Sequence, residues 1–134
     1  MDWQLLTTDE EITAFLGDVY GFHDGYLRAA HVVFGSGDPQ ASPYGDDRHK
    51  AVGRLSIDTP SGPHSRMRLI ELRFEDLVAC HVRPAGAAYD PTILEADIIR
   101  RDDVYYWCLA ESLIGGTDST WMGGRRLSWR VADE

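Results

Sequence analysis

The spacing of apolar residues changes once along this chain, at Gly25, from a helical repeat to a strand repeat. At 100° per residue, the apolar positions between residues 12 and 23 fall on one side of a helix. This stripe comprises Ile12, Phe15, Leu16, Val19, Phe22 and His23. Beyond Gly25, apolar residues alternate with polar ones, as they do on the two faces of a strand. The sequence therefore predicts one helix followed by sheet.

A capping box marks the start of the predicted helix. Thr8 and Glu11 have the S/T-x-x-E spacing, in which each side chain binds the backbone N–H of the other residue. Asp9 adds negative charge at the positive end of the helix dipole. We therefore expect the helix to begin at residue 9, and to be capped at its C-terminus by Gly21 or Gly25.

The remaining apolar segments predict an antiparallel sheet. We expect strands at residues 26–34, 51–58, 65–74, 77–83, 93–100, 104–110 and 125–131, with a short strand at 3–6. Two short links predict tight hairpins, Glu75-Asp76 and Arg101-Asp102-Asp103. The pairs Gly115-Gly116 and Gly123-Gly124 predict turns, and longer loops are expected at 35–50, 59–64 and 84–91.

Chain length limits this architecture to one core. The chain has 134 residues, of which 43% are hydrophobic, so we expect a single domain over residues 1–134. The predicted fold is α+β, with one N-terminal amphipathic helix packed on a twisted, mostly antiparallel sheet of six to eight strands that can curl into a half-barrel. One helix leaves part of such a sheet uncovered, so a homodimer is one expected state.

Charge narrows the classes of partner. The formal net charge is -9, so a nucleic-acid backbone or an anionic membrane surface would be repelled, and basic proteins would be attracted. No apolar run approaches the roughly 20 residues that span a bilayer. The first residues have neither the basic nor the apolar region of a signal peptide, so we expect a cytoplasmic protein.

Two cysteines are present, and their surroundings predict inert thiols. Cys80 and Cys108 both follow apolar residues and do not have the spacing of a CxxC motif. We expect both to be buried and reduced, because a cytoplasmic thiol in an apolar segment usually acts as a small hydrophobe.

Three short patches resemble a family of small uncharacterised bacterial proteins. The patches are Phe22-His23-Asp24-Gly25-Tyr26, Ile70-Glu71-Leu72-Arg73-Phe74-Glu75 and Leu127-Ser128-Trp129-Arg130. The family pattern is a helix ending in FHD, a central strand similar to IELxFxG, and a terminal LxWR; here Asp76 stands where the family pattern has the glycine. The resemblance implies the helix-plus-sheet layout, and it implies no established activity, substrate or cofactor.

His23 and Asp24 are the adjacent residues best suited to catalysis or ligand binding. Adjacent His and Asp also occur in metal phosphohydrolases, but that chemistry needs further ligands from other helices, and this sequence predicts one helix. Because His23 falls inside the apolar stripe, we expect a buried, hydrogen-bonded ring whose tautomer Asp24 fixes. Contact with a ligand, and catalysis, remain the two alternatives for this pair.

Glu71 and the scattered histidines give further candidates. Glu71 lies between apolar neighbours, where a carboxylate can act as a general base, but a cross-strand ion pair is the expected role. A zinc or manganese site could draw on His23, Asp24, His31, His64 and His81. Their spacings match no ligand pattern, so we expect no metal, no cofactor and no catalytic residue.

Aromatic residues gather in the second half of the chain. Tyr105, Trp107, Trp121 and Trp129 are expected in the core, whereas Tyr106 points to the other face of its strand and is the candidate for exposure. Neither glycine pair is a phosphate loop, because no lysine follows in that pattern and no helix is predicted after it.

Two functions remain open from the sequence. The first is a non-enzymatic cytoplasmic binding or protein-interaction module, such as an immunity-type protein that neutralises a partner. The second is a small-molecule binder or enzyme whose pocket lies near the helix C-terminus, around His23, Asp24 and Tyr26. A concave pocket holding these three side chains would favour the second function, and a flat face with exposed aromatic residues would favour the first.

Overall fold

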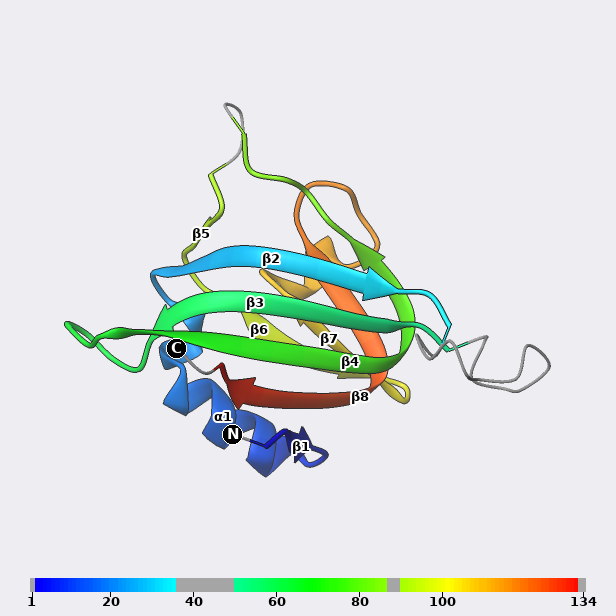
Figure 1. Cartoon of the computed structure of the whole chain (residues 1–134), viewed down its shortest axis with the longest axis horizontal. Coiled ribbons are helices and arrows are strands. Elements are labelled where there is room, and N and C mark those ends of the chain that lie inside the picture. Colours follow the sequence, from blue (N-terminus) through cyan, green and yellow to red (C-terminus); the bar gives the residue numbers. More distant parts are fainter. Residues whose placement is uncertain (1, 36–49, 87–89, 133–134) are drawn as a thin grey trace.

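The computed structural model describes residues 2–35, 50–86 and 90–132, and these form a curled antiparallel sheet with one α-helix (Figure 1). The elements are β1 (Gln4–Leu6), α1 (Asp9–Asp18), η1 (Tyr20–Phe22), β2 (Gly25–Val33), β3 (Val52–Pro60), β4 (Met67–His81), β5 (Thr92–Ile93), β6 (Asp97–Arg101), β7 (Val104–Cys108), η3 (Glu111–Leu113) and β8 (Trp121–Val131). The strand order is β5-β2-β3-β4-β8-β7-β6, and β1 pairs with β8. The predicted α+β half-barrel is therefore confirmed.

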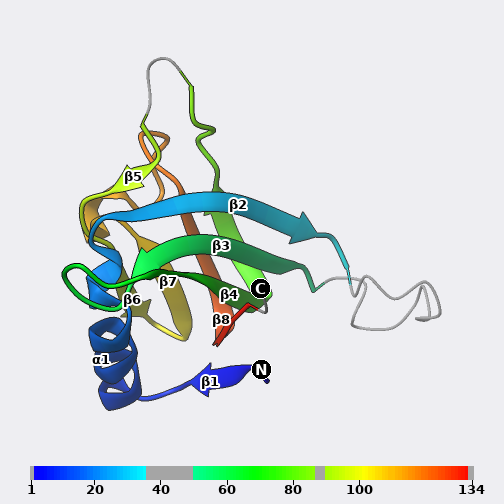
Figure 2. The same cartoon turned by 60° about the vertical axis from the view of Figure 1, so that its left-hand side comes forward.

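The capping box is formed as predicted. Thr8 accepts a hydrogen bond from the backbone N–H of Glu11, and the Glu11 carboxylate accepts one from the backbone N–H of Thr8 at 3.0 Å. Further hydrogen bonds from Thr7 lower the pKa of Glu11. The helix lies at one end of the curled sheet, where the Phe15 ring packs on the Trp129 ring (Figure 2).

The helix ends earlier than predicted, which changes the position of His23. The C-cap is Val19, and the next three residues, Tyr20, Gly21 and Phe22, all have positive φ angles. A helical repeat of 100° per residue therefore cannot be extended to His23. Phe22 is still fully buried, but the His23 side chain is 47% exposed, so the prediction of a buried His23 is wrong.

The core fills the concave side of the sheet. Its side chains come from α1, from η1 and from the inward-facing residues of nearly every strand. The fully buried ones are Val19, Phe22, Leu55, Ile57, Ile70, Leu72, Phe74, Met122 and Leu127. The alternation of buried and half-buried residues along β3 and β4 shows why the sequence of these strands predicted one apolar face.

The link at Glu75-Asp76 is not a hairpin. These residues lie inside β4, a single strand of 15 residues that pairs with β3 and β8. Asp76 has a φ angle of 53°, and the register to β8 shifts by one residue between Leu77 and Ala79. Such an irregularity bends a strand without ending it, and the sequence signal for a turn was therefore the signal for a bend.

The pair Gly123-Gly124 is not a turn either. Both glycines lie within β8, where β7 and β4 pair on either side. A Cβ atom on Gly124 would lie 2.9 Å from the carbonyl oxygen of Glu75, and one on Gly123 would lie 2.4 Å from the Tyr106 ring. The glycines therefore allow three strands to approach closely at the point where the sheet curls.

The other predicted strand and loop boundaries are either confirmed or moved by the structure. The Arg101-Asp102-Asp103 hairpin, the strand within residues 3–6 and the turn at Gly115-Gly116 are confirmed. The strand predicted at 93–100 is two strands, β5 and β6. The loop predicted from residue 59 begins after Pro60, because Thr59 and Pro60 still pair with β4. The loop predicted at 35–50 lies almost wholly outside the described residues, as does 87–89 of the loop at 84–91.

None of the helices in the described residues has the length and apolar character of a membrane span.

Replacement of Gly124 by alanine tests the close approach of the strands. We expect Gly124→Ala to lower the free energy of unfolding by about 1–3 kcal/mol, because the added methyl group meets backbone atoms that cannot rotate away. The matched control is Gly17→Ala on α1, where nothing lies within 4 Å of the added Cβ and a stabilisation of about 0.5–1 kcal/mol is expected. Urea titration of both variants measures the difference, and equal stabilities would contradict the close approach.

Candidate functional site

Most of strand β2 has an open edge. The short strand β5 pairs only with Gly25 and Tyr26. The backbone N–H of Leu27 donates to the Pro91 carbonyl oxygen at 3.5 Å. From Arg28 to Val33, β2 pairs with β3 on one side, and no strand of the described residues pairs with its other side. An unpaired edge presents backbone N–H and C=O groups that can pair with another chain.

A shallow groove of about 270 Å³ runs along this edge, and we call it the β2 groove. Five consecutive residues of β2 form one wall, and the segment that follows β4 forms the other. The lining residues are Tyr26, Leu27, Arg28, Ala29, Ala30, Val82, Arg83, Pro84, Ala85 and Pro91. Two alanines at the middle of the β2 wall keep the groove open, because their side chains are small.

The β2 groove is apolar, with arginine as its charged residue. Tyr26 is 43% exposed and Val82 is 42% exposed, so both present apolar surface. Arg28 binds the Asp58 carboxylate at 2.7 Å, and this hydrogen bond raises the pKa of Arg28. The backbone N–H of Arg83 donates to the Thr120 hydroxyl at 2.9 Å. This bond fixes the second wall to the residue that precedes β8. Among the described residues, no carboxylate lines the groove.

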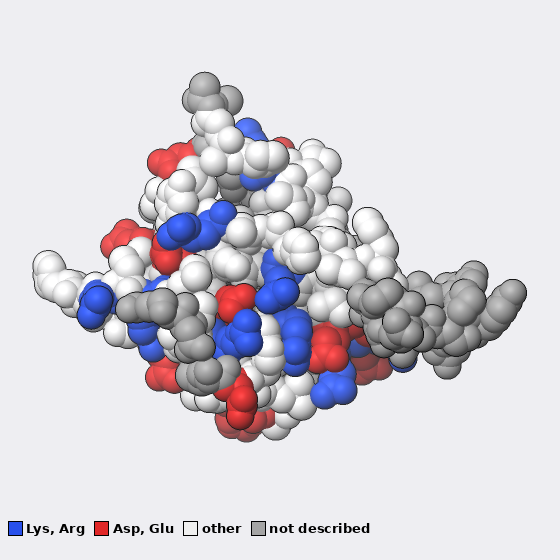
Figure 3. Space-filling model, in the orientation of Figure 1, with Lys and Arg blue, Asp and Glu red and all other residues white. Residues whose placement is uncertain are grey.

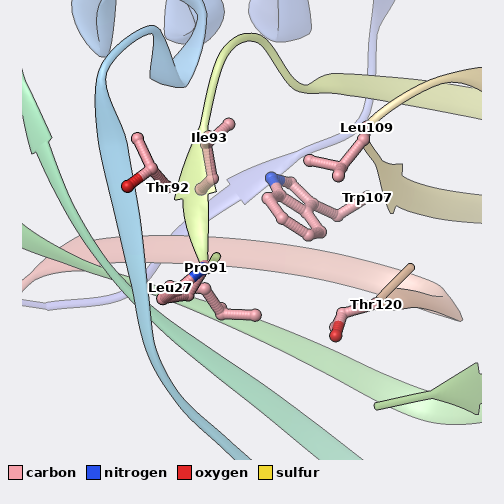
Figure 4. A pocket seen from close by; sticks show the side chains of 7 residues that line it. All are labelled: Leu27, Pro91, Thr92, Ile93, Trp107, Leu109 and Thr120. Atoms are coloured by element: carbon pink, nitrogen blue, oxygen red, sulfur yellow. The ribbon is translucent and has the colours of Figure 1, made fainter. Parts of the chain in front are cut away.

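A small cavity lies inside the sheet directly beneath the β2 groove (Figure 4). Leu27 and Pro91 line both, and the other lining residues are Thr92, Ile93, Trp107, Leu109 and Thr120. The indole N–H of Trp107 is buried, and within the described residues it has no hydrogen-bond partner. The cavity has room for about one water molecule, which is too little for an organic ligand.

The structure does not assemble the pocket predicted around His23, Asp24 and Tyr26. His23 donates from Nδ1 to the carbonyl oxygen of Leu94, and its Nε2 lies 3.7 Å from the Asp24 carboxylate. Asp24 is 70% exposed and makes no hydrogen bond that fixes the tautomer. Neither residue lines the β2 groove or the cavity beneath it, whereas Tyr26 lines the groove.

Glu71 is engaged in cross-strand ion pairs, as expected. Its carboxylate oxygens lie 3.4 Å from the Arg54 guanidinium on β3 and 2.9 Å from the Arg130 guanidinium on β8. Both carboxylate oxygens are therefore occupied by arginine side chains. The geometry therefore favours a structural role for Glu71 over proton transfer.

The aromatic side chains alternate across β7 as predicted, but Tyr106, the candidate for exposure, is half-buried. Tyr105 and Trp107 are buried, and Tyr106 faces the other side of β7, where it is half-buried against Gly123 and Trp121. The Trp121 indole N–H donates to the Gly116 carbonyl oxygen at 2.9 Å. Tyr106 therefore packs over the glycine of the curl and presents little free surface.

The candidate metal ligands lie apart. In the described part of the chain, no group of three or more His, Cys, Asp or Glu side chains is placed to hold a metal ion. His31 is exposed on β2, His64 is exposed in the loop after β3, and His81 donates from Nδ1 to the Ser119 carbonyl oxygen at 3.0 Å.

Sequence reasoning missed the β2 groove. Ala29 and Ala30 carry no chemical signal by themselves, and the identity of an edge strand depends on pairings between segments far apart in the chain. A signal was present in Tyr26, an aromatic residue near the start of a strand that follows Asp24. Comparisons with protein-family models, with curated proteins and with solved structures found no match.

The two cysteines are free, but only one is fully buried. Cys108 is buried, and burial raises the pKa of its thiol to about 11. Cys80 is only half-buried, which corrects the expectation for that residue, and burial raises the pKa of its thiol as well.

Thiol labelling tests this difference. Because the thiolate is the reactive form, Cys108 at pH 8 has a reactive fraction on the order of one in a thousand, in addition to being shielded. We expect a maleimide to label Cys80 first and Cys108 only after unfolding. Mass spectrometry of the native protein over time measures both, and early labelling of Cys108 would contradict its burial.

Proposed function

We propose that this chain is a non-enzymatic protein-interaction module of the bacterial cytoplasm, of the immunity type that neutralises a partner, and that it binds an extended segment of its partner along the β2 groove. The observation that carries this proposal is the edge of β2 from Arg28 to Val33, which no strand of the described residues covers, beside an apolar groove. Addition of a strand to a sheet edge is a common mode of peptide recognition, in which backbone hydrogen bonds give affinity and side-chain contacts give selectivity.

The shape of the groove supports an extended peptide over a compact ligand. Its lining follows consecutive residues of one strand, and its volume lies below the range of small-molecule pockets, about 300–1,000 Å³. The polar groups that would fix a small ligand do not converge on one point. A strand would instead contact the wall residue by residue.

The charge of the groove indicates the chemistry of the segment. The net charge of -9 led us to expect a basic partner, but the charged residues lining the groove are Arg28 and Arg83. Arg28 is paired with Asp58 and Arg83 donates to the Asp118 carbonyl oxygen, so a mainly apolar segment complements this lining. The acidic surface elsewhere on the chain would act on the approach of a basic partner and on its orientation.

The chemically reactive residues give little support to catalysis. Glu71 is held by two arginines, and Cys108 has a raised pKa. His23 and Asp24 border neither hollow on this side of the sheet. The alternative of a small-molecule binder or enzyme therefore has no assembled site among the described residues to support it.

Selection of peptides tests the proposal. A display library of random eight-residue peptides is selected on the folded chain, and a selected peptide is titrated into ¹⁵N-labelled protein. We expect chemical-shift changes that centre on Tyr26–Ala30 and Val82–Ala85. Ala29→Trp, which fills the groove from an exposed position, should weaken binding about tenfold or more.

The matched control is Ala110→Trp, at an exposed alanine outside the groove, which should leave the affinity within about twofold. Failure to select any peptide, shifts confined to another surface, or equal binding by the Ala29→Trp variant would each contradict the proposal.

A further inference from the structure

A row of polar side chains, two of them arginines, crosses the outer face of the sheet. His31 on β2 pairs with Arg54 on β3, Arg54 pairs with Arg73 on β4, and Arg73 pairs with Ser128 on β8. Residues paired in register project from the same face of a sheet. We call these four residues the arginine row. Figure 3 views this face and shows arginine side chains gathered near its centre.

Two arginines on neighbouring strands lie opposite each other, which is electrostatically unfavourable in a sheet. Like charges directly opposite each other on neighbouring strands destabilise the pairing, yet Arg54 and Arg73 are directly opposite. Glu71 and Glu75 offset part of the repulsion, at 3.4 Å from Arg54 and from Arg73 respectively. With Arg130 also bound to Glu71, three arginines share two carboxylates among the described residues, which leaves one positive charge at this point of a chain of net charge -9.

Two polar atoms in the row are buried without a partner. Within the described residues, neither Nε of Arg73 nor the hydroxyl of Ser128 makes a hydrogen bond, and Ser128 is only 3% exposed. Buried polar groups in folded proteins nearly always have partners. These two residues are register neighbours, so one acceptor that entered between them would satisfy both atoms, which are fully buried without it.

Trp3 holds the arginines in place beside this point. Its ring lies 4.4 Å from the Arg73 guanidinium and 4.3 Å from that of Arg130. These distances are those of cation–π contacts, which restrict the rotation of long side chains. The site is therefore organised before any ligand arrives, and organisation of this kind lowers the cost of binding.

We propose that the arginine row, with Arg130, binds an oxyanion, the phosphate or carboxylate group of a small ligand. The planar guanidinium fork matches both groups, and the Ser128 hydroxyl would donate a further hydrogen bond. A small anion is favoured over a polyanion, because the rest of the chain carries negative charge. This site lies on the outer face of the sheet and does not depend on the proposed peptide groove.

Titration with simple anions tests the inference. Inorganic phosphate, and separately acetate, are added to ¹⁵N-labelled full chain at constant ionic strength set with chloride. We expect saturable shifts at the amides of Arg54, Arg73 and Ser128 and at Nε of Arg73. Stronger saturation by phosphate identifies a phosphate ligand, and equal or stronger saturation by acetate identifies a carboxylate ligand.

Variants with opposite expected effects keep the test decisive. Arg73→Gln should weaken binding about tenfold, and Ser128→Ala about threefold. Glu71→Gln should strengthen binding about threefold, because Arg54 and Arg130 lose their competing carboxylate. Arg100→Gln, which removes an exposed arginine from β6, is the charge-matched control and should stay within about twofold.

Linear shifts without saturation for both anions, or a Glu71→Gln variant that binds phosphate more weakly than the parent chain, would overturn the proposal.

Discussion

The pairing of β4 with both β3 and β8 is the interaction on which the rest of the structure depends. Side chains alternate along β4, so Ile70, Leu72 and Phe74 are fully buried while Glu71 and Arg73 face outward. The inward residues form the floor of the core that α1 and η1 cover. The outward residues lie between strands on both sides, so their charges must be balanced across strands, and the ion pairs of Glu71 follow from this requirement.

The curl of the sheet accounts for the open edge at β2. Gly123 and Gly124 let β8 pass close to β4 and β7, and the irregularity near Asp76 bends β4 in the same region. The sheet therefore wraps around the core without joining its two edges, β5-β2 on one side and β6 on the other. Because β5 pairs with Gly25 and Tyr26, and Pro91 binds the Leu27 N–H, the part of the chain that the structure describes leaves the edge of β2 unpaired from Arg28 onward.

Residues with strong local signals were predicted correctly from the sequence. The capping box of Thr8 and Glu11, the Asp102-Asp103 turn and the alternation along β4 are all determined by neighbours in the chain. Errors arose where contacts between residues far apart in the chain determine the local structure. Gly123 and Gly124 were mistaken for a turn, because only the strand pairing shows that Tyr106 and Glu75 occupy the space beside them. His23 was misplaced because the positive φ angles before it break the helical repeat.

The central claim is that the edge of β2 beyond Leu27 is open in the isolated chain. Amide hydrogen exchange of residues Ala29–Val33, measured by NMR on the free protein, tests it most directly, because successive N–H groups of a strand point to opposite edges. The account predicts an alternation along β2, with slow exchange for amides bonded to β3 and fast exchange for amides at the open edge. Uniformly slow exchange over these residues would show that the edge is already covered, and would contradict the account.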